Sequence, residues 1–312
     1  MFSKKDVTFV IIGKNEELNL NRCFKSVKVE TNNIIYVDSN STDNSINVAK
    51  KNDIIKIIKF NSNYYTASLA RHIGAKHVKS KLIHFLDGDM TLANGWLEKS
   101  IDFMNSNKKI VVVHGYKKEY KNDLINFSIK KDSKNWQSDY LQGSYLIKTK
   151  SYFEAGELDS RFPGEEERDL YVRIFYNGGQ VWYLDQLMAS HYDFKKRGFK
   201  YLFVSNVSVA ILIPLFKFFN FQYFLSYLFV YRRLVLVLFF ELLSFISFLF
   251  SGYHVVLVFI IIQLFSLLYC LSIKRIGYFI LWKSAFLNFI RVFKLINRKA
   301  IYKINIIKNE ST

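Results

Sequence analysis

The stretch that decides the fold is Leu82-Ile83-His84-Phe85-Leu86, a short apolar run that ends directly at Asp87-Gly88-Asp89. Short apolar runs bounded by polar turns are typical of buried strands. Similar runs lie on both sides of it: Val7–Ile12, Ile34–Val37, Ile54–Phe60 and Ile110–Val113. The stretches between these runs have polar ends and a partial helical periodicity, which predicts helices over 16–27, 42–51, 65–79 and 95–105. This alternation predicts an α/β fold with a mostly parallel sheet covered by helices on both faces.

A less regular region follows from about residue 114 to 190. Its pattern predicts a strand at Ser144–Lys148, a helix at Glu165–Tyr176 and a strand at Gln180–Leu184. Ligands of open α/β sheets bind beyond the carboxyl ends of the strands. We therefore expect the functional residues at the ends of the apolar runs.

Composition and charge divide the chain at about residue 200. Of the 312 residues, 50% are hydrophobic and 17% aromatic, which excludes a disordered or low-complexity protein. Residues 1–200 carry 32 Lys and Arg against 24 Asp and Glu, whereas residues 201–312 carry 12 against 2. These later cations flank long apolar runs, which favours an anionic membrane surface over nucleic acid as the partner.

Two apolar runs, Leu234–Ser251 and His254–Ser272, contain 18 and 19 residues. Each would span roughly 27–29 Å as a helix, close to the thickness of a bilayer core. Basic residues lie before the first run and after the second, so both ends are expected in the cytoplasm. The sequence therefore predicts an all-α membrane region with a transmembrane hairpin over 234–273. It follows a catalytic domain over 1–198 and interfacial or re-entrant helices over 199–233, and it precedes a basic amphipathic cytoplasmic tail over 274–312.

Several catalytic motifs are absent from the sequence. There is no P-loop, no G-x-G-x-x-G after the first strand, no H-E-x-x-H and no G-x-S-x-G. What remains is a set of carboxylates at strand ends, since Asp38 follows Ile34–Val37 and Asp87-Gly88-Asp89 follows Leu82–Leu86. In a parallel sheet these ends lie on one rim. Paired carboxylates across a glycine turn suit Mg²⁺ or Mn²⁺, which share oxygen ligands with substrate phosphates.

Further short motifs follow one another in a fixed order along the chain. They are Asn15-Glu16-Glu17, Tyr36-Val37-Asp38, Ser41-Thr42-Asp43, Ala70-Arg71-His72, Asp87-Gly88-Asp89, Gln142-Gly143-Ser144, Gly156-Glu157-Leu158-Asp159 and Glu166-Glu167-Arg168-Asp169-Leu170. The series resembles the family 2 glycosyltransferases, inverting enzymes with the GT-A nucleotide-diphospho-sugar transferase fold. The resemblance covers about residues 5–195.

The resemblance implies a nucleotide-sugar site at the ends of the first two strands. Ile12, Gly13 and Glu16 would border the nucleotide. Asp38 matches the acidic residue that binds the base, usually uracil, and Asp43 lies in the same loop.

The resemblance also implies a centre for the diphosphate and a divalent metal. Arg71 matches a basic residue near the diphosphate. Asp87, Gly88 and Asp89 match the D-x-D motif that holds the metal and the sugar nucleotide, with Asp89 as the direct ligand. His191 lies where many members place a further metal ligand.

The catalytic base of the family usually lies in an E-D-x-D-L segment at the start of a helix. Glu167 occupies the position of the base here, with Glu in place of Asp. The longer side chain leaves Glu166 or Glu165 as alternatives. An acidic run at this place also stabilises the helix dipole.

The resulting hypothesis is a metal-dependent inverting glycosyltransferase of hexosyltransferase type, using Mn²⁺ or Mg²⁺. It would move sugar from a nucleotide-sugar donor, with UDP as the expected nucleotide, to a lipid-linked saccharide or another surface-glycan acceptor in polysaccharide biosynthesis. The protein is expected to be integral to the inner cell membrane with its catalytic domain in the cytoplasm. Two alternatives remain open: a polyprenyl-phosphate sugar synthase, and a degenerate transferase that binds nucleotide-sugar as a membrane scaffold.

Overall fold

A computed structural model of the chain describes residues 1–121, 124–126, 134–162, 164, 166–192, 221–230 and 299–307, together with 232, 236, 239, 261, 263–266 and 268. Contacts divide the chain into two units. The first contains Met1–Lys195 and Lys299–Thr312, and the second contains Lys196–Arg298.

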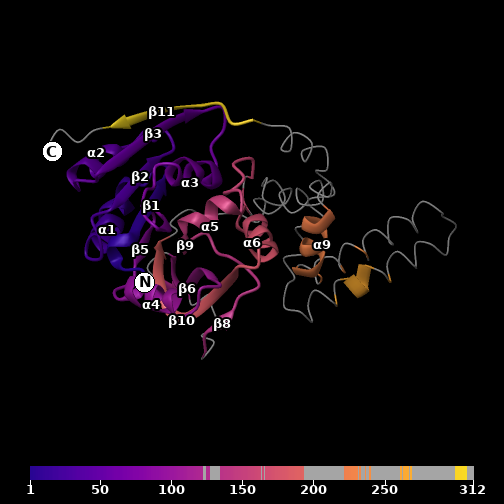
Figure 1. Cartoon of the computed structure of the whole chain (residues 1–312). Helices are drawn as coiled ribbons and strands as arrows, with labels where there is room; N and C mark the ends of the chain where they lie inside the picture. Colours follow the sequence, from indigo (N-terminus) through magenta and orange to yellow (C-terminus); the bar gives the residue numbers. More distant parts are fainter. Residues whose placement is uncertain are drawn as a thin grey trace. The chain divides into compact units, whose positions relative to one another are not determined.

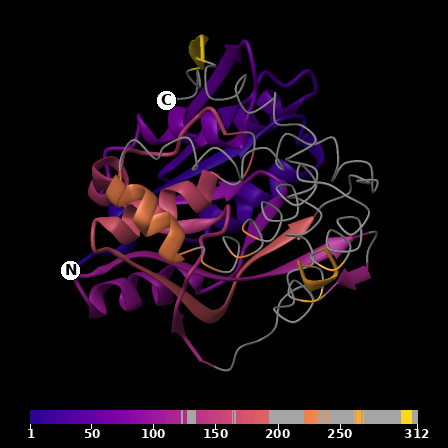
Figure 2. The ribbon, with the colours of Figure 1, turned by 90° about the vertical axis from the view of Figure 1, so that its right-hand side faces the viewer.

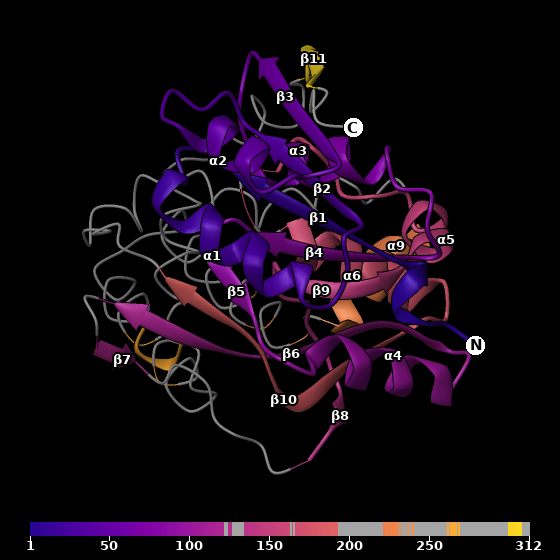
Figure 3. The same ribbon diagram turned by 90° about the vertical axis from the view of Figure 1, so that its left-hand side faces the viewer.

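The described strands of the first unit form one sheet (Figures 1 and 3). Their bounds are β1 (Val7–Gly13), β2 (Ile34–Asp38), β3 (Lys56–Ser62), β4 (Leu82–Asp87), β5 (Met90–Leu92), β6 (Ile110–Lys121), β7 (Leu124–Asn126), β8 (Trp136–Gln137), β9 (Tyr145–Lys148), β10 (Gln180–Tyr192) and β11 (Tyr302–Ile307). The order across the sheet is β11-β3-β2-β1-β4-β9-β6-β10-β5, with β7 paired to β6 and β8 paired to β10. The predicted α/β class is thus confirmed.

The sheet is mixed, whereas the sequence predicted a mostly parallel one. Strands β3, β2, β1 and β4 pair in parallel, and β6 pairs with β10 in parallel (Figure 2). Between these two groups lies β9, which is antiparallel to both β4 and β6. The direction of this four-residue strand depends on its tertiary partners, which an apolar run does not reveal.

Helices cover both faces of the sheet. They are α1 (Glu17–Lys28), α2 (Ser45–Lys51), α3 (Ala67–Ala75), α4 (Trp96–Ser106), α5 (Thr149–Glu154) and α6 (Glu166–Tyr176), and a short 3-10 helix, η1 (Lys4–Asp6), precedes β1. On one face, Phe24 of α1 packs edge-on against Tyr36 of β2. On the other face, Tyr152 of α5 packs against Phe85 of β4. Strand β1 is therefore buried on both sides, which explains its unbroken apolar sequence.

Helix α3 lies close against the parallel strands. A Cβ at Gly74 would lie 2.4 Å from Val10 Cγ1 and 2.9 Å from Val37 Cγ2, so a larger residue does not fit there. The helix begins at Thr66, whose hydroxyl accepts a hydrogen bond from the Leu69 amide at 3.0 Å. Arg71 lies one turn before Gly74 on the same helix, so this close packing fixes the position of Arg71 relative to the ends of the strands.

The end of the chain returns to the first unit as β11. Tyr302–Ile307 pairs antiparallel with β3 at the edge of the sheet (Figure 1). Asn63 extends this contact, because its side chain accepts a hydrogen bond from the Ile301 amide and donates one to the Lys299 carbonyl, both at 3.1 Å. This strand lies within the segment 274–312 for which the sequence predicted a basic amphipathic tail, and the open backbone of the β3 edge gives it a hydrogen-bonding partner.

In the second unit the structure describes one helix, α9 (Phe221–Val230), within the segment for which the sequence predicted interfacial or re-entrant helices. The predicted hairpin over 234–273 lies outside the described residues, apart from a few single positions. Among the described residues, no helix combines the length and the apolar character that a membrane crossing requires.

Candidate active site

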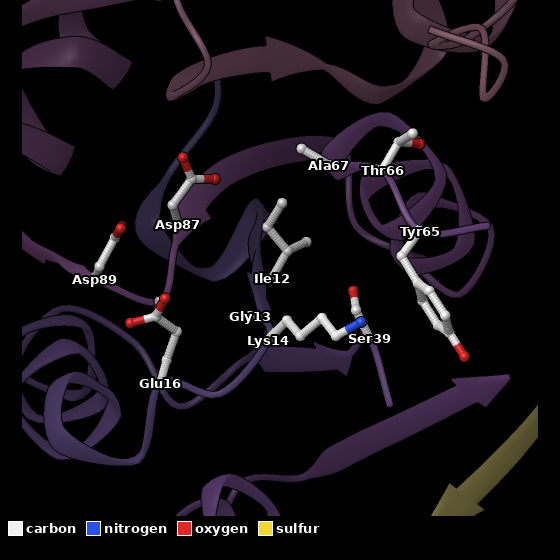
Figure 4. A pocket seen from close by; sticks show the side chains of 11 residues that line it. Ile12, Gly13, Lys14, Glu16, Ser39, Tyr65, Thr66, Ala67, Asp87 and Asp89 are labelled. Atoms are coloured by element: carbon white, nitrogen blue, oxygen red, sulfur yellow. The ribbon is translucent and has the colours of Figure 1, made fainter. Parts of the chain in front are cut away.

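The carboxyl ends of β1, β2 and β4 meet at one rim of the sheet. The register pairs Gly13 with Asp38 and Ile12 with Asp87, so the strand ends lie side by side. A cavity of about 240 Å³ opens at this rim. It is lined by Ile12, Gly13, Lys14, Glu16, Ser39, Tyr65, Thr66, Ala67, Asp87, Gly88 and Asp89. Figure 4 shows Asp87 and Asp89 at one end of this cavity and Tyr65 with Thr66 at the other.

The turn Asp87-Gly88-Asp89 is held against the end of β1. The Gly88 amide donates a hydrogen bond to the Ile12 carbonyl at 2.8 Å. A Cβ at Gly88 would lie 3.1 Å from that same oxygen and 3.0 Å from Leu20 Cδ2. A side chain at this position would therefore crowd the end of β1 and Leu20, so glycine suits the close approach of the turn.

Asp38 and Asp43, predicted to lie at the nucleotide, accept hydrogen bonds from nearby backbone and hydroxyl groups. Asp38 is fully buried and accepts hydrogen bonds from the Tyr36 hydroxyl at 3.1 Å and the Ser41 amide at 2.8 Å. Asp43 accepts hydrogen bonds from the Ser45 amide and hydroxyl and from the Glu17 amide. Neither is among the residues that line the cavity, which Ser39 reaches in their place.

Arg71 lies at the centre of three carboxylates. Its Nη2 donates to Asp87 Oδ1 at 2.8 Å. Its Nη1 donates to Glu166 Oε1 and Glu167 Oε1, both at 2.9 Å. The arginine thus joins β4 to the start of α6, and it does not itself line the cavity.

The three carboxylates differ in exposure and charge. The side chain of Glu166 is 3% exposed, whereas that of Glu167 is 14% exposed and that of Asp87 is 29% exposed. Burial raises the pKa of Glu166 to about 8, the charge of Glu167 adds to this rise, and Arg71 opposes it. Burial disfavours the charged form of Arg71, but the three carboxylates outweigh it and raise the pKa of the guanidinium. At neutral pH Glu166 is therefore mostly protonated beside a charged Arg71.

Because Gly143 has no side chain, the backbone at this position can lie directly against the ion pairs of Arg71. A Cβ at Gly143 would lie 3.0 Å from Arg71 Nη2 and 3.2 Å from Glu167 Oε1. The backbone between Gln142 and Ser144 therefore covers the ion pairs directly and excludes water from one side of them.

A second polar cluster lies beside Asp89. His191 Nε2 lies 3.2 Å from Asp89 Oδ2, and His191 Nδ1 lies 2.6 Å from Glu119 Oε2. Burial alone would lower the pKa of His191, but the hydrogen bonds to Asp89 and Glu119 outweigh it and raise the pKa to about 10. Without a bound cation the imidazolium therefore donates to both carboxylates, and a metal held at Nε2 would take the place of the proton there.

Residues 8–157 match the family described as Glycosyl transferase family 2. The match supports a transferase enzyme. An uncharacterized glycosyltransferase of Haemophilus influenzae is 34% identical over 100 residues, which cover 31% of this chain and 37% of the relative.

Solved structures share the fold of the first unit. GalNAc-T7, solved with UDP, GalNAc and Mn²⁺, aligns with a TM-score of 0.51 and 17% identity over 61% of this chain and 44% of its own. S. aureus TarS residues 1–349, solved with UDP-GlcNAc, aligns with a TM-score of 0.54 and 14% identity over 66% of each chain. The likeness shows a GT-A-like fold. The chain spans less than half of the Haemophilus relative and of GalNAc-T7.

The donor set beside the cavity fits a divalent cation that also binds the substrate. Within the described ranges, no three His, Cys, Asp or Glu side chains cluster so that they hold a metal by themselves. Asp89 and His191 nevertheless converge to 3.2 Å. Mg²⁺ sites commonly use one or two carboxylates and leave the other positions to water and substrate phosphates. A carboxylate that lines the cavity, with an imidazole directly beside it, fits such a shared site.

Sequence reasoning missed six residues of this region: Lys14, Ser39, Tyr65, Thr66, Ala67 and Glu119. The Lys14 ammonium lies 4.1 Å from the centre of the Tyr65 ring, and both line the cavity. Their positions in the sequence could have revealed them, because Lys14 directly follows β1 and Tyr65 lies just before α3. Glu119 lies in Tyr116-Lys117-Lys118-Glu119-Tyr120, which has no apolar alternation that would predict a strand.

Proposed function

We propose that this protein is a metal-dependent inverting glycosyltransferase. It moves a sugar from a nucleoside-diphosphate sugar, with UDP as the expected nucleotide, to an acceptor hydroxyl. One observation carries the proposal: the cavity at the ends of β1 and β4 has Asp87 and Asp89 at its border, and Asp87 is joined through Arg71 to Glu167. A donor site and a candidate base are thereby adjacent. The UDP ligands of GalNAc-T7 and TarS support UDP as the nucleotide.

Glu167 is the proposed base that takes the proton from the acceptor hydroxyl. Its side chain is more exposed than that of Glu166, 14% against 3%, so an acceptor reaches it more easily. Arg71 Nη1 donates to Glu167 Oε1 at 2.9 Å and so holds the proposed base in place. Glu166, mostly protonated at neutral pH, is a poor base. Glu165, the further alternative, lies outside the described residues.

Asp89 and His191 would hold the divalent cation, whose chemistry is to neutralise the charge that develops on the departing diphosphate. Lys14 and Ser39 border the same cavity and suit the nucleotide side of the donor. Arg71 acts through its partners, because it orients Asp87 and Glu167 across the cluster. A single catalytic carboxylate suits direct displacement, which forms no covalent glycosyl-enzyme and so inverts the anomeric centre.

The proposed acceptor is a lipid-linked saccharide or a surface glycan, and the proposed location is the cytoplasmic side of the inner membrane. The support comes from the sequence: the two apolar runs over 234–251 and 254–272 have the length of bilayer spans, and basic residues flank them.

Nucleotide binding tests the proposal. In calorimetry of the purified full chain, we expect one of UDP, GDP and dTDP to bind in the presence of Mn²⁺ or Mg²⁺. Chelator and the Asp89→Asn substitution should each weaken this binding at least tenfold, about 1.4 kcal/mol. Chelator removes the cation that links the diphosphate to the protein, and the substitution removes the carboxylate charge that holds this cation. Binding of none of the three nucleotides would contradict the proposal.

A further inference from the structure

Glu119 contacts the far side of His191, at the end of the longest parallel pair in the sheet. The register of β6 and β10 places Glu119 directly beside His191 on neighbouring strands. Its Oε2 lies 2.6 Å from His191 Nδ1. A carboxylate only accepts, so the ring nitrogen donates this bond.

The backbone around His191 is fixed, but the backbone does not set the orientation of its ring. Strand β5 pairs with β10 so that His191 lies opposite Met90, and the Tyr192 amide donates to the Asp89 carbonyl at 3.0 Å. These bonds hold the two main chains together. A half-turn of the imidazole would still put ring carbons where its two nitrogens lie and turn Nε2 away from Asp89.

The hydrogen bond from Nδ1 to Glu119 opposes that rotation. With Nδ1 held by Glu119, Nε2 is the nitrogen that faces Asp89 Oδ2. The next residues on the same strands, Tyr120 and Tyr192, stack with ring centroids 4.8 Å apart and planes 12° apart. The guanidinium carbon of Arg22 lies 3.7 Å from the centre of the Tyr192 ring. This stack fixes the end of β6 relative to β10, and therefore Glu119 relative to His191.

We propose that Glu119 is a positioning residue that orients the His191 imidazole for a divalent cation shared with Asp89. The inference rests on the proposed function, because that function puts the cation at these two side chains. A carboxylate behind a metal-binding histidine fixes the ring and makes the nitrogen a stronger donor, and loss of such a partner typically weakens metal binding by about 10- to 100-fold.

The test is Mn²⁺ binding to the full chain in the presence of UDP, followed by electron paramagnetic resonance. We expect Glu119→Ala to weaken Mn²⁺ binding by about 10- to 100-fold. Glu119→Gln keeps an oxygen that accepts from Nδ1, so its affinity should lie between those of Glu119→Ala and the wild type. The matched control is Glu154→Ala, an exposed glutamate on α5 whose side chain is 57% exposed, and it should bind as the wild type does.

A spectroscopic signal separates positioning from a general loss of structure. Bound Mn²⁺ should show nitrogen coupling from the imidazole in spin-echo spectra of the wild type. His191→Ala should abolish this coupling, and Glu119→Ala should reduce it even when Mn²⁺ is raised to saturation. Circular dichroism of each variant should show an unchanged fold.

The outcomes distinguish this inference from the proposed function. Wild-type affinity and wild-type nitrogen coupling in Glu119→Ala, with binding still lost in Asp89→Asn, would overturn the role of Glu119 alone. Equal Mn²⁺ binding in wild type and Asp89→Asn, or none in either, would overturn the metal site and with it both proposals.

Discussion

Replacing Glu167 by Gln is expected to lower turnover by about 100- to 10,000-fold, the usual contribution of a general base. Glutamine keeps the size of the side chain and an oxygen that accepts from Arg71, but it does not accept the proton of the acceptor hydroxyl. Binding of the nucleotide should stay at the wild-type level, because Glu167 does not line the donor cavity. Steady-state kinetics and calorimetry on the same preparation measure the two effects separately.

Glu166→Gln is the matched control for this prediction. Glu166 is its neighbour and also accepts a hydrogen bond from Arg71 Nη1 at 2.9 Å. Because burial holds the pKa of Glu166 at about 8, an amide closely resembles the protonated carboxyl that is present at neutral pH. Its loss of turnover should be far smaller. The reverse result, an active Glu167→Gln and an inactive Glu166→Gln, would transfer the role of base to Glu166.

Replacing Arg71 by Met is expected to destabilise the fold by about 3–5 kcal/mol, the typical cost of leaving a buried charge without its partner. The substitution keeps an apolar stem but leaves Asp87, Glu166 and Glu167 close together without a cation. For a unit of about this size the midpoint of thermal unfolding should fall by about 6–20 °C. The loss should shrink as the pH is lowered, since protonation removes the repulsion between the carboxylates.

Arg161→Met provides the comparison for Arg71. Arg161 also binds a carboxylate, Asp159 Oδ2 at 2.6 Å, but its side chain is 34% exposed. Exposed ion pairs contribute only about 0–1 kcal/mol, so this variant should unfold within a few degrees of the wild type. Equal unfolding midpoints for the two variants would show that the Arg71 cluster does not stabilise the fold.

The sequence predicts the parallel half of the sheet well, because buried parallel strands have continuous apolar runs. The predicted strand at Leu82–Leu86 is confirmed as β4, and the predicted helix at Glu165–Tyr176 is confirmed as α6. The antiparallel insertion of β9 and the return of β11 were not predictable, since both depend on partners far away in the sequence. Strand β11 is separated from β3 by more than two hundred residues.

The candidate site was predicted in part. The cavity is lined by Asp87 and Asp89, because strand ends on one rim converge. His191 lies beside Asp89. The contacts of Arg71 with Glu166 and Glu167 join segments about 95 residues apart, and a linear sequence does not show them. Asp38 accepts a hydrogen bond from the Ser41 amide, and the following run of Ser, Asn and Thr is typical of such loops. Its contact with a base stays a prediction.

The most direct measurement of the central claim is release of nucleoside diphosphate from sugar nucleotides by the purified full chain. UDP-, GDP- and dTDP-sugars would be incubated with Mn²⁺, with and without a lipid extract as the acceptor source. We predict release from the sugars of one nucleotide, increased by the acceptor and abolished by chelator and by Asp89→Asn. Tight nucleotide binding without release from any of these donors, or release that persists in Asp89→Asn with chelator present, would contradict the account.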